Sequence, residues 1–191
     1  MANRLKKIII NTLGPVTTDS YRATRYWIKK NGIVDYKIKM HDSFEQIFTR
    51  MKGQEYIVMP VGYVNRNSEK MSSWVDFHFR YINDIIPDDV FTLHTKPMAL
   101  VENVSYKKRG VVIQSSTYQL AKSTLKTTAD EYIYASSKSK ALQLFLKSQY
   151  HFTICSKELI TKYDSTNYRI LQEFRPVMIW VVYRIKNTIN Q

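Results

Sequence analysis

Apolar and polar positions along the chain alternate between short strand-like runs and helix-like segments. Residues 7–11 contain three consecutive isoleucines, and residues 19–30 follow with aromatic or apolar side chains at near-helical spacing. Residues 36–40 alternate as a strand does, and residues 41–53 have a helical pattern. Residues 55–61 form a nearly continuous apolar run, which is typical of a strand buried on both faces. The first 61 residues therefore predict the order β-α-β-α-β.

Both predicted helices carry residues that commonly end or begin a helix. Gly32 is expected to end the first one, because glycine is frequent directly after a helix. In the second, Asp42 and Glu45 stand three residues apart, which is the spacing of a capping box, and Gly53 is expected to close it.

The middle of the chain is less regular, and strand-to-helix transitions return after it. Residues 62–89 loosen into Asn, Ser and Gly, and we expect the crossing to a second lobe there. Residues 90–93 and 98–104 predict strands. Three later strands are each followed by a turn with hydroxyl or thiol side chains and then a helix, and Pro176 separates two final strands. The chain is thus of the α/β class.

The hydroxyl-rich turns are candidates for a ligand site. In open α/β sheets, ligands bind beyond the carboxyl ends of the strands, where helix N-termini present N–H donors. Ser and Thr at a helix start often only cap it, so a capping role is the alternative at every single turn. Their repetition favours a site for a small organic polyanion. The predicted substrate-binding residues are Thr17, Thr18, Ser115, Ser116, Thr117, Ser136, Ser137, Lys138 and Ser139.

Charge narrows the class of partner. The chain has 29 Lys and Arg against 16 Asp and Glu, a net charge of +13, which favours anionic partners. Nucleic acid is one such partner, and Trp74, Phe77, Phe79 and Tyr81 could form a stacking surface for it. The same aromatic residues are explained equally by a lobe-bridging strand that packs its aromatic face. Because no RNA-binding or zinc-finger signature is present, a small anion is favoured over nucleic acid.

Other classes are excluded by missing patterns. No apolar window approaches the roughly 20 residues of a membrane span, and no secretory signal is recognised at the start of the chain. The single cysteine, Cys155, predicts a packed thiol, and no Cys/His cluster has metal-ligand spacing. No turn has the glycine spacing of a nucleotide site. We therefore expect a soluble cytoplasmic protein without metal or cofactor.

The order of several motifs resembles the catalytic domain of prephenate dehydratases. The matching stretches cover nearly the whole chain: "TLGPVTTDSYRA", "IKMHDSFEQIF", "YIVMPVGY", "VIQSSTYQLAK", "YASSKSKAL", "FTICSKELITKY" and "VMIWVVYRI". The resemblance implies one domain, 1–191, with a type II periplasmic-binding-protein-like fold, mixed sheets and a central cleft. It places about 1–65 and 160–191 in one lobe and about 88–158 in the other.

The chain departs from the family pattern at four places, and at two of them, residues 62–63 and 178–180, it is similar to the prephenate decarboxylase branch of bacilysin biosynthesis. Residues 16–18 replace the Gly-Thr that follows the Gly-Pro turn, and residues 62–63 stand where the family has Glu-Asn. Residues 115–117 replace Ser-His-Pro. Residues 178–180 stand in place of Thr-Arg-Phe, whose threonine is the catalytic group of dehydratases. Methionine at position 178 cannot assist a leaving hydroxyl, and the decarboxylase branch is similar there.

The resemblance implies a lyase that decarboxylates prephenate or a related cyclohexadienyl dicarboxylate without aromatisation, in antibiotic biosynthesis. Its candidate catalytic residues are His41, Tyr63 and Met178, and Lys138 or Arg22 could hold a carboxylate. His41 has a structural alternative, since a histidine beside a capping Asp often only forms a hydrogen bond. A dehydratase is the less favoured activity, and a binding or regulatory module without catalysis is the alternative. A homodimer is compatible with the sequence.

Overall fold

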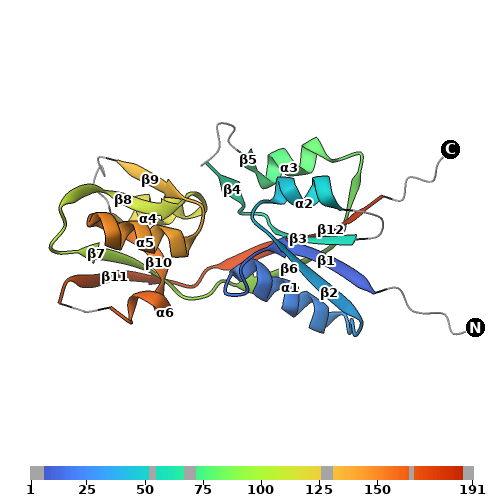
Figure 1. The fold of residues 1–191 in the computed structure, drawn as a ribbon, viewed down its shortest axis with the longest axis horizontal. Coiled ribbons are helices and arrows are strands. Elements are labelled where there is room, and N and C mark those ends of the chain that lie inside the picture. Colours follow the sequence, from blue (N-terminus) through green and yellow to red (C-terminus); the bar gives the residue numbers. More distant parts are fainter. Residues whose placement is uncertain (1–6, 52–54, 67–71, 126–130, 164–165, 187–191) are drawn as a thin grey trace, which may run out of the picture. The chain divides into compact units, whose positions relative to one another are not determined.

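The computed structural model describes residues 7–51, 55–66, 72–125, 131–163 and 166–186, which fold into two compact units (Figure 1). The first unit takes its described residues from Met1–Tyr63, Ser73–Leu93 and Val177–Gln191, and the second from Val64–Ser72 and His94–Pro176. The lobe limits 1–65 with 160–191, and 88–158, stay a prediction that the resemblance implies.

The first unit contains a mixed five-stranded sheet with the strand order β2-β1-β3-β12-β6. Its strands are β1 (Ile8–Leu13), β2 (Tyr36–His41), β3 (Glu55–Pro60), β6 (Ile85–His94) and β12 (Val177–Ile185). β1 runs parallel to β2 and β3, whereas β12 runs antiparallel to β3. The β-α-β-α-β order predicted for the first 61 residues is confirmed.

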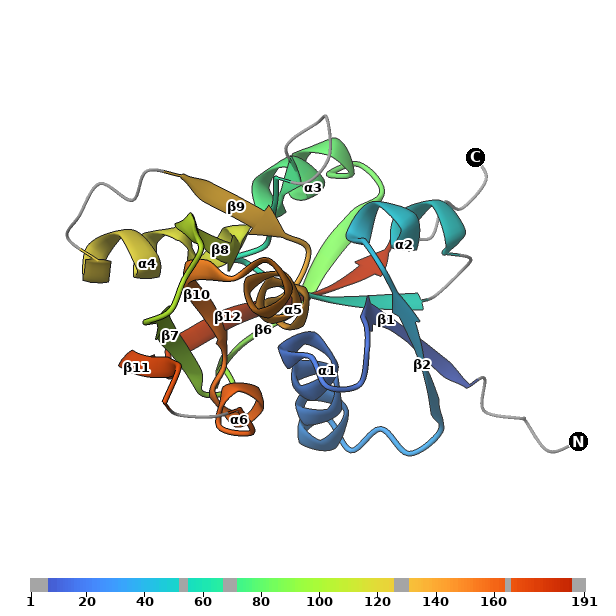
Figure 2. The same ribbon diagram turned by 60° about the vertical axis from the view of Figure 1, so that its left-hand side comes forward.

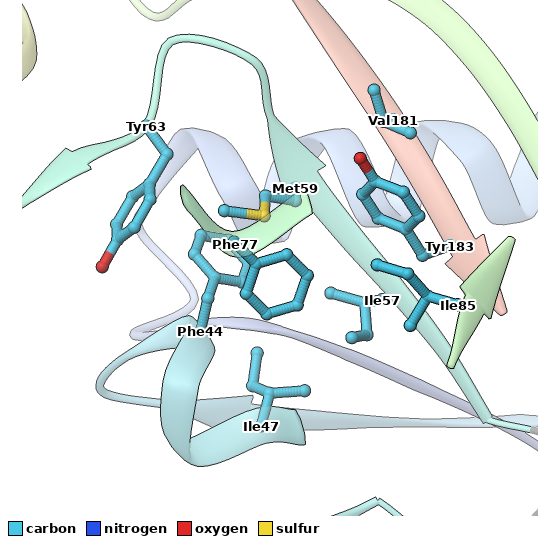
Figure 3. Close-up of a cluster of buried hydrophobic side chains, with 9 residues drawn as sticks. All are labelled: Phe44, Ile47, Ile57, Met59, Tyr63, Phe77, Ile85, Val181 and Tyr183. Atoms are coloured by element: carbon cyan, nitrogen blue, oxygen red, sulfur yellow. The ribbon is translucent and has the colours of Figure 1, made fainter. Parts of the chain in front are cut away.

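Helices cover both faces of this sheet. The helices are α1 (Asp19–Lys30), α2 (Phe44–Arg50) and α3 (Trp74–Arg80). Val58 faces the cluster that includes Trp27 of α1. Ile57 and Met59, on either side of it, face the cluster that includes Phe44 of α2 (Figure 3). Successive residues of a strand point to opposite faces, so a continuous apolar run at β3 is what a doubly covered strand requires.

The ends of α1 and α2 confirm one sequence expectation and correct another. α1 ends at Lys30, and the N–H of Gly32 then donates to the carbonyl of Lys29 at 3.2 Å. α2 is capped by Ser43, whose hydroxyl accepts from the N–H of Gln46, so the capping box predicted from Asp42 and Glu45 is wrong by one residue. Gly53 lies outside the described residues.

The aromatic segment 74–81 contains a helix, so its interpretation as a lobe-bridging strand is wrong. Ser73 and Asp76 form a capping box that begins α3. Phe77 is 2% exposed and packs between Phe44, Tyr81 and Tyr183, whereas Phe79 is 65% exposed. Most of these rings therefore serve the core of the first unit, and they do not line up as one stacking surface.

The second unit contains another mixed five-stranded sheet, with the order β11-β7-β10-β8-β9. Its strands are β7 (Met98–Asn103), β8 (Lys108–Gln114), β9 (Tyr132–Ala135), β10 (Tyr150–Ser156) and β11 (Tyr168–Phe174). Its helices are the 3-10 turn η1 (Ser115–Thr117), α4 (Tyr118–Leu125), α5 (Lys138–Ser148) and α6 (Lys157–Ile160). β8 is parallel to β9 and β10, so their carboxyl ends share one edge.

Helices also cover both faces of the second sheet. Leu142 and Phe145 of α5 and Ile160 of α6 pack on one face, and Ala121 of α4 packs on the other. Figure 2 shows the three helices beside this sheet. Two further short strands, β4 (Val64–Asn65) and β5 (Ser72–Ser73), pair with each other.

Candidate functional site

The carboxyl ends of β1 and β2 meet at one edge of the first sheet and line an open pocket. Leu13 pairs with His41 in the parallel ladder, and the N–H of Gly14 donates to the carbonyl of His41 at 3.0 Å. A Cβ atom on Gly14 would lie 3.1 Å from Met40 Cβ, so glycine allows this turn to pack closely on β2. The pocket has a volume of about 290 Å³ and is lined by Gly14, Pro15, Met40, His41, Asp42, Gln46 and Arg50.

A chain of buried polar side chains leads from His41 into the sheet. His41 Nε2 lies 2.8 Å from Asn11 Oδ1, and Asn11 Nδ2 donates to Glu55 Oε2 at 2.8 Å and to the carbonyl of Tyr56 at 3.2 Å. Lys39 Nζ donates to Glu55 Oε1 at 2.8 Å. Asn11 is 1% and Glu55 4% exposed, so the centre of this network is shielded from water.

Burial and neighbouring charges favour the neutral form of the His41 ring. Burial of the half-buried ring lowers the pKa of His41 below its usual value of 6.5, and the charges of Arg50 and Lys39 lower it further, against the opposite effects of Glu55 and Asp42. A neutral imidazole is both a hydrogen-bond donor and an acceptor. The exposed Arg50 supplies the positive charge of the pocket, so the site combines a cation with a neutral histidine.

The sequence analysis named His41 but missed Arg50, Asn11 and Glu55. Arg50 is in the last turn of α2, where a basic residue commonly serves only the helix end. For Asn11 the sequence did contain a signal, since a polar residue directly after three isoleucines is unusual in a buried strand. Its partner Glu55 is 44 residues away, and only the strand order β2-β1-β3 brings the two together.

Tyr63 and Met178, the other predicted catalytic residues, lie in apolar clusters of the first unit. Tyr63 is 9% exposed, packs edge-on against Phe44, and its hydroxyl lies 3.5 Å from Glu45 Oε2, on the side away from Met59 (Figure 3). Met178 packs against the cluster of α1 and approaches Gly62 closely. A catalytic role for either residue stays a prediction.

Of the two predicted hydroxyls in the first unit, one caps a helix. Thr18 is the N-cap of α1: its hydroxyl accepts from the N–H of Tyr21 at 3.2 Å and lies within donating distance of the carbonyls of Leu13 and Pro15. Thr17 is exposed. The capping alternative therefore applies to Thr18, and ligand binding by either residue stays a prediction.

In the second unit, strand pairing brings two predicted hydroxyl-rich turns together. Gln114 pairs with Ala135 in parallel, so residues 115–117 and 136–139 follow adjacent strand ends. Ser115 and Thr117 are buried and Ser116 is exposed, and the Thr117 hydroxyl donates to the carbonyl of Gln114 at 2.8 Å.

The second turn has one capping hydroxyl. Ser137 caps α5 by accepting from the N–H of Lys140 at 3.2 Å. Ser136 and Ser139 are exposed, and Lys138 is half-buried. Their roles in substrate binding stay predictions, as do those of residues 115–117.

An arginine that the sequence analysis did not select lies beside these turns. The guanidinium of Arg66 stands 5.4 Å from the Tyr118 ring and 5.2 Å from the Tyr134 ring, and its Nη1 donates to the Tyr134 hydroxyl at 3.0 Å. Lys122 stands 5.7 Å from the same Tyr118 ring. The rings hold Arg66 in place at the hydroxyl-rich edge, where a fixed guanidinium is suited to an anion.

Cys155 is fully buried, and burial raises the pKa of its thiol to about 12. This agrees with the packed thiol expected from the sequence. Within the described residues no group of three or more metal-ligating side chains occurs, and no helix there is long and apolar enough to cross a membrane.

Comparisons with known proteins address the fold. No family model matches the sequence, and no curated protein matches it either. Among solved structures, the prephenate dehydratase of Staphylococcus aureus is 14% identical, with 96% of this chain and 69% of that chain covered and a TM-score of 0.51. An ABC transporter protein of Parabacteroides distasonis is 15% identical over 93% of this chain and 66% of its own, with a TM-score of 0.58.

A third similar structure was solved with a ligand. The structure of R. palustris Rpa4515 with adipate is 12% identical in sequence, and the match has a TM-score of 0.57. It covers 99% of this chain and 80% of the Rpa4515 chain. At these identities the likeness concerns the fold alone. The mixed α/β fold predicted from the sequence is confirmed: the chain has the periplasmic-binding-like fold that prephenate dehydratase also has.

Proposed function

We propose that the protein binds a small organic dicarboxylate through the pocket at the ends of β1 and β2, and that it acts on prephenate or a related cyclohexadienyl dicarboxylate. The observation that carries the proposal is the pairing of Arg50 with His41 in one pocket. A guanidinium can bind a carboxylate with two parallel hydrogen bonds, and a neutral imidazole adds a directional polar contact. A pocket of about 290 Å³ is close to the lower end, roughly 300 Å³, of small-molecule sites.

The favoured activity is decarboxylation without aromatisation, as in the bacilysin branch of the family. The bond between the ring and its carboxylate breaks, carbon dioxide leaves, and the electron pair retained by the ring system takes up a proton. Met178 packs in an apolar cluster and has no proton to give to a leaving hydroxyl. The ring hydroxyl would then stay in place, which is the difference between this reaction and dehydration.

His41 and Tyr63 remain the candidates for carrying the proton. Because burial and nearby charges lower the pKa of His41, the neutral ring is favoured, and one nitrogen of a neutral ring can accept a proton or hydrogen bond. The Tyr63 hydroxyl is a donor as well as an acceptor of hydrogen bonds.

Ligand binding without catalysis is the second candidate. It is favoured by the many family positions that this chain replaces, among them residues 62–63, 115–117 and 178–180. The adipate complex of Rpa4515 shows that a protein of similar fold holds a dicarboxylate.

The two candidates are separated by incubating the purified protein with prephenate. Release of carbon dioxide with a non-aromatic product supports the decarboxylase, and phenylpyruvate indicates a dehydratase instead. Binding measured by calorimetry without turnover supports the second candidate, and absence of both binding and turnover refutes the proposal.

The pocket itself is tested by Arg50→Gln, with Arg25→Gln as a matched control. Arg25 is an exposed arginine of α1, so its replacement removes the same charge from the protein. We expect Arg50→Gln to weaken prephenate binding about tenfold or more, since hydrogen bonds to charged groups contribute about 1.5–3 kcal/mol. Equal affinities of the two variants would exclude this pocket.

A further inference from the structure

The direction of the hydrogen bonds between Glu55 and His41 is fixed by chemistry. Asn11 Nδ2 faces two groups that only accept: the Glu55 carboxylate, paired with Lys39 at 2.8 Å, and the carbonyl of Tyr56. The side-chain amide can therefore satisfy both only with its NH₂ group on that side. Its oxygen, Oδ1, must then face His41.

The orientation of Asn11 determines which nitrogen of His41 carries the proton. An amide oxygen can only accept, and His41 Nε2 lies 2.8 Å from it, so Nε2 carries the hydrogen and donates. In the neutral ring the other nitrogen, Nδ1, is then an acceptor. Nδ1 has no hydrogen-bond partner among the residues that the structure describes, and it belongs to a ring that lines the pocket.

We propose that Lys39, Glu55 and Asn11 are positioning residues that hold His41 as a hydrogen-bond acceptor toward the pocket, so that the preferred ligand carries a hydroxyl group beside its carboxylate. The carboxylate binds Arg50, and the hydroxyl donates to His41 Nδ1. This ligand class rests on the proposed function of the same pocket and specifies which carboxylates it selects. An otherwise identical carboxylate without the hydroxyl leaves Nδ1 buried by the ligand and unpaired.

Replacement of Glu55 by Gln should reverse the network. Lys39 only donates, so the oxygen of the introduced side-chain amide would face Lys39 and its NH₂ group would face Asn11. Asn11 would then give up its longer bond, 3.2 Å to the carbonyl of Tyr56, and turn its oxygen to the introduced amide and its own NH₂ group to His41. His41 Nε2 would have to accept, and the proton would move to Nδ1, facing the ligand.

The first measurement is the nitrogen NMR spectrum of the histidine rings in the wild-type protein near pH 7.5, about one unit above the usual histidine pKa. The chain has four histidines, and loss of one signal set in His41→Gln assigns His41. We expect the tautomer with hydrogen on Nε2. A wild-type ring with hydrogen on Nδ1 overturns the proposal, even if no variant can be purified.

The second measurement compares two probes by calorimetry, 4-hydroxycyclohexanecarboxylate and cyclohexanecarboxylate. One hydrogen bond to a neutral partner predicts about tenfold tighter binding of the hydroxylated probe to the wild type. In Glu55→Gln we expect the preference to fall to about twofold or less, with the tautomer changed. Glu173→Gln is the control, because Glu173 is another glutamate paired with a lysine, Lys157, at 2.7 Å in the second unit. This variant should keep the wild-type preference for the hydroxylated probe and the wild-type tautomer of His41.

The outcomes separate this inference from the function on which it rests. If both probes bind equally to the wild type and Arg50→Gln weakens both, the pocket binds carboxylates but the inference is wrong. If neither probe nor prephenate binds, the proposed function is refuted and the ligand class falls with it. An unchanged preference and tautomer in a folded Glu55→Gln would also overturn the positioning role.

Discussion

Replacement of Asn11 by Ala should destabilise the first unit far more than the loss of an ordinary surface amide. The side chain is 1% exposed and forms three hydrogen bonds, to Glu55, Tyr56 and His41. The bond to the Glu55 carboxylate contributes about 1.5–3 kcal/mol, and the two bonds to neutral groups contribute about 0.5–1.5 kcal/mol each. The expected loss is about 2.5–6 kcal/mol, a large part of the roughly 5–15 kcal/mol that stabilises a typical domain.

Urea unfolding followed by tryptophan fluorescence measures this loss in the appropriate unit. All three tryptophans, at positions 27, 74 and 180, belong to the first unit, so their emission reports its unfolding. Asn31→Ala is the matched control, because that side chain makes one hydrogen bond, to the carbonyl of Trp27 at 2.9 Å, and should cost about 0.5–1.5 kcal/mol. Equal losses of unfolding free energy in the two variants would refute the account of the buried network.

Three further predictions concern pH, packing and thiol reactivity. The pKa of His41 is lowered in the folded protein, so the unfolded chain binds more protons below about pH 6.5. The unfolding free energy, measured by urea unfolding at a series of pH values, should therefore fall as the pH decreases from about 7.5 to 5. In His41→Gln this fall should be less steep. A Cβ atom on Gly62 would lie 3.0 Å from Met178 Cε, so Gly62→Ala should lower the free energy of unfolding by about 1 kcal/mol. When Met178 is also replaced by Ala, the same change at Gly62 should cause no loss of stability in thermal unfolding. Because the Cys155 thiol is buried and its pKa is raised to about 12, it should react with a chromogenic disulfide reagent only after unfolding, and rapid labelling of the native protein would contradict this.

Elements in which apolar residues recur at a regular helical or strand spacing could be predicted from the sequence, whereas the short aromatic helix α3 could not. Residues 19–30 have helical spacing and form α1 over the same residues. α3 spans seven residues with three aromatic rings, a composition that favours strands. The capping box of Ser73 and Asp76 was its readable signal. At α2 the spacing of a capping box fits Ser43 and Gln46 as well as Asp42 and Glu45, so spacing alone could not identify the cap.

The site could be predicted only where it follows directly from a strand end. The Gly14-Pro15 turn and His41 are such residues, because parallel strands bring their carboxyl ends to one edge. Arg66 is held by contacts with the Tyr118 and Tyr134 rings, which come from two other segments, and no local pattern encodes this. The hydroxyl-rich turns had two interpretations in the sequence, and the hydrogen bonds of Thr18 and Ser137 match the capping one.

The buried network is an expensive way to stabilise a sheet, and this is the main reason to assign it a function. Removing the Glu55 carboxylate, 5% exposed, from water costs several kcal/mol, and apolar residues of similar size commonly stabilise a fold as well or better. Glu55 and Asn11 occupy strand positions between the apolar residues of β1 and β3, where apolar side chains would suffice for packing. Since every hydrogen bond in the network has a fixed direction that ends at one ring of the pocket, the orientation of His41 is what the network supplies beyond stability.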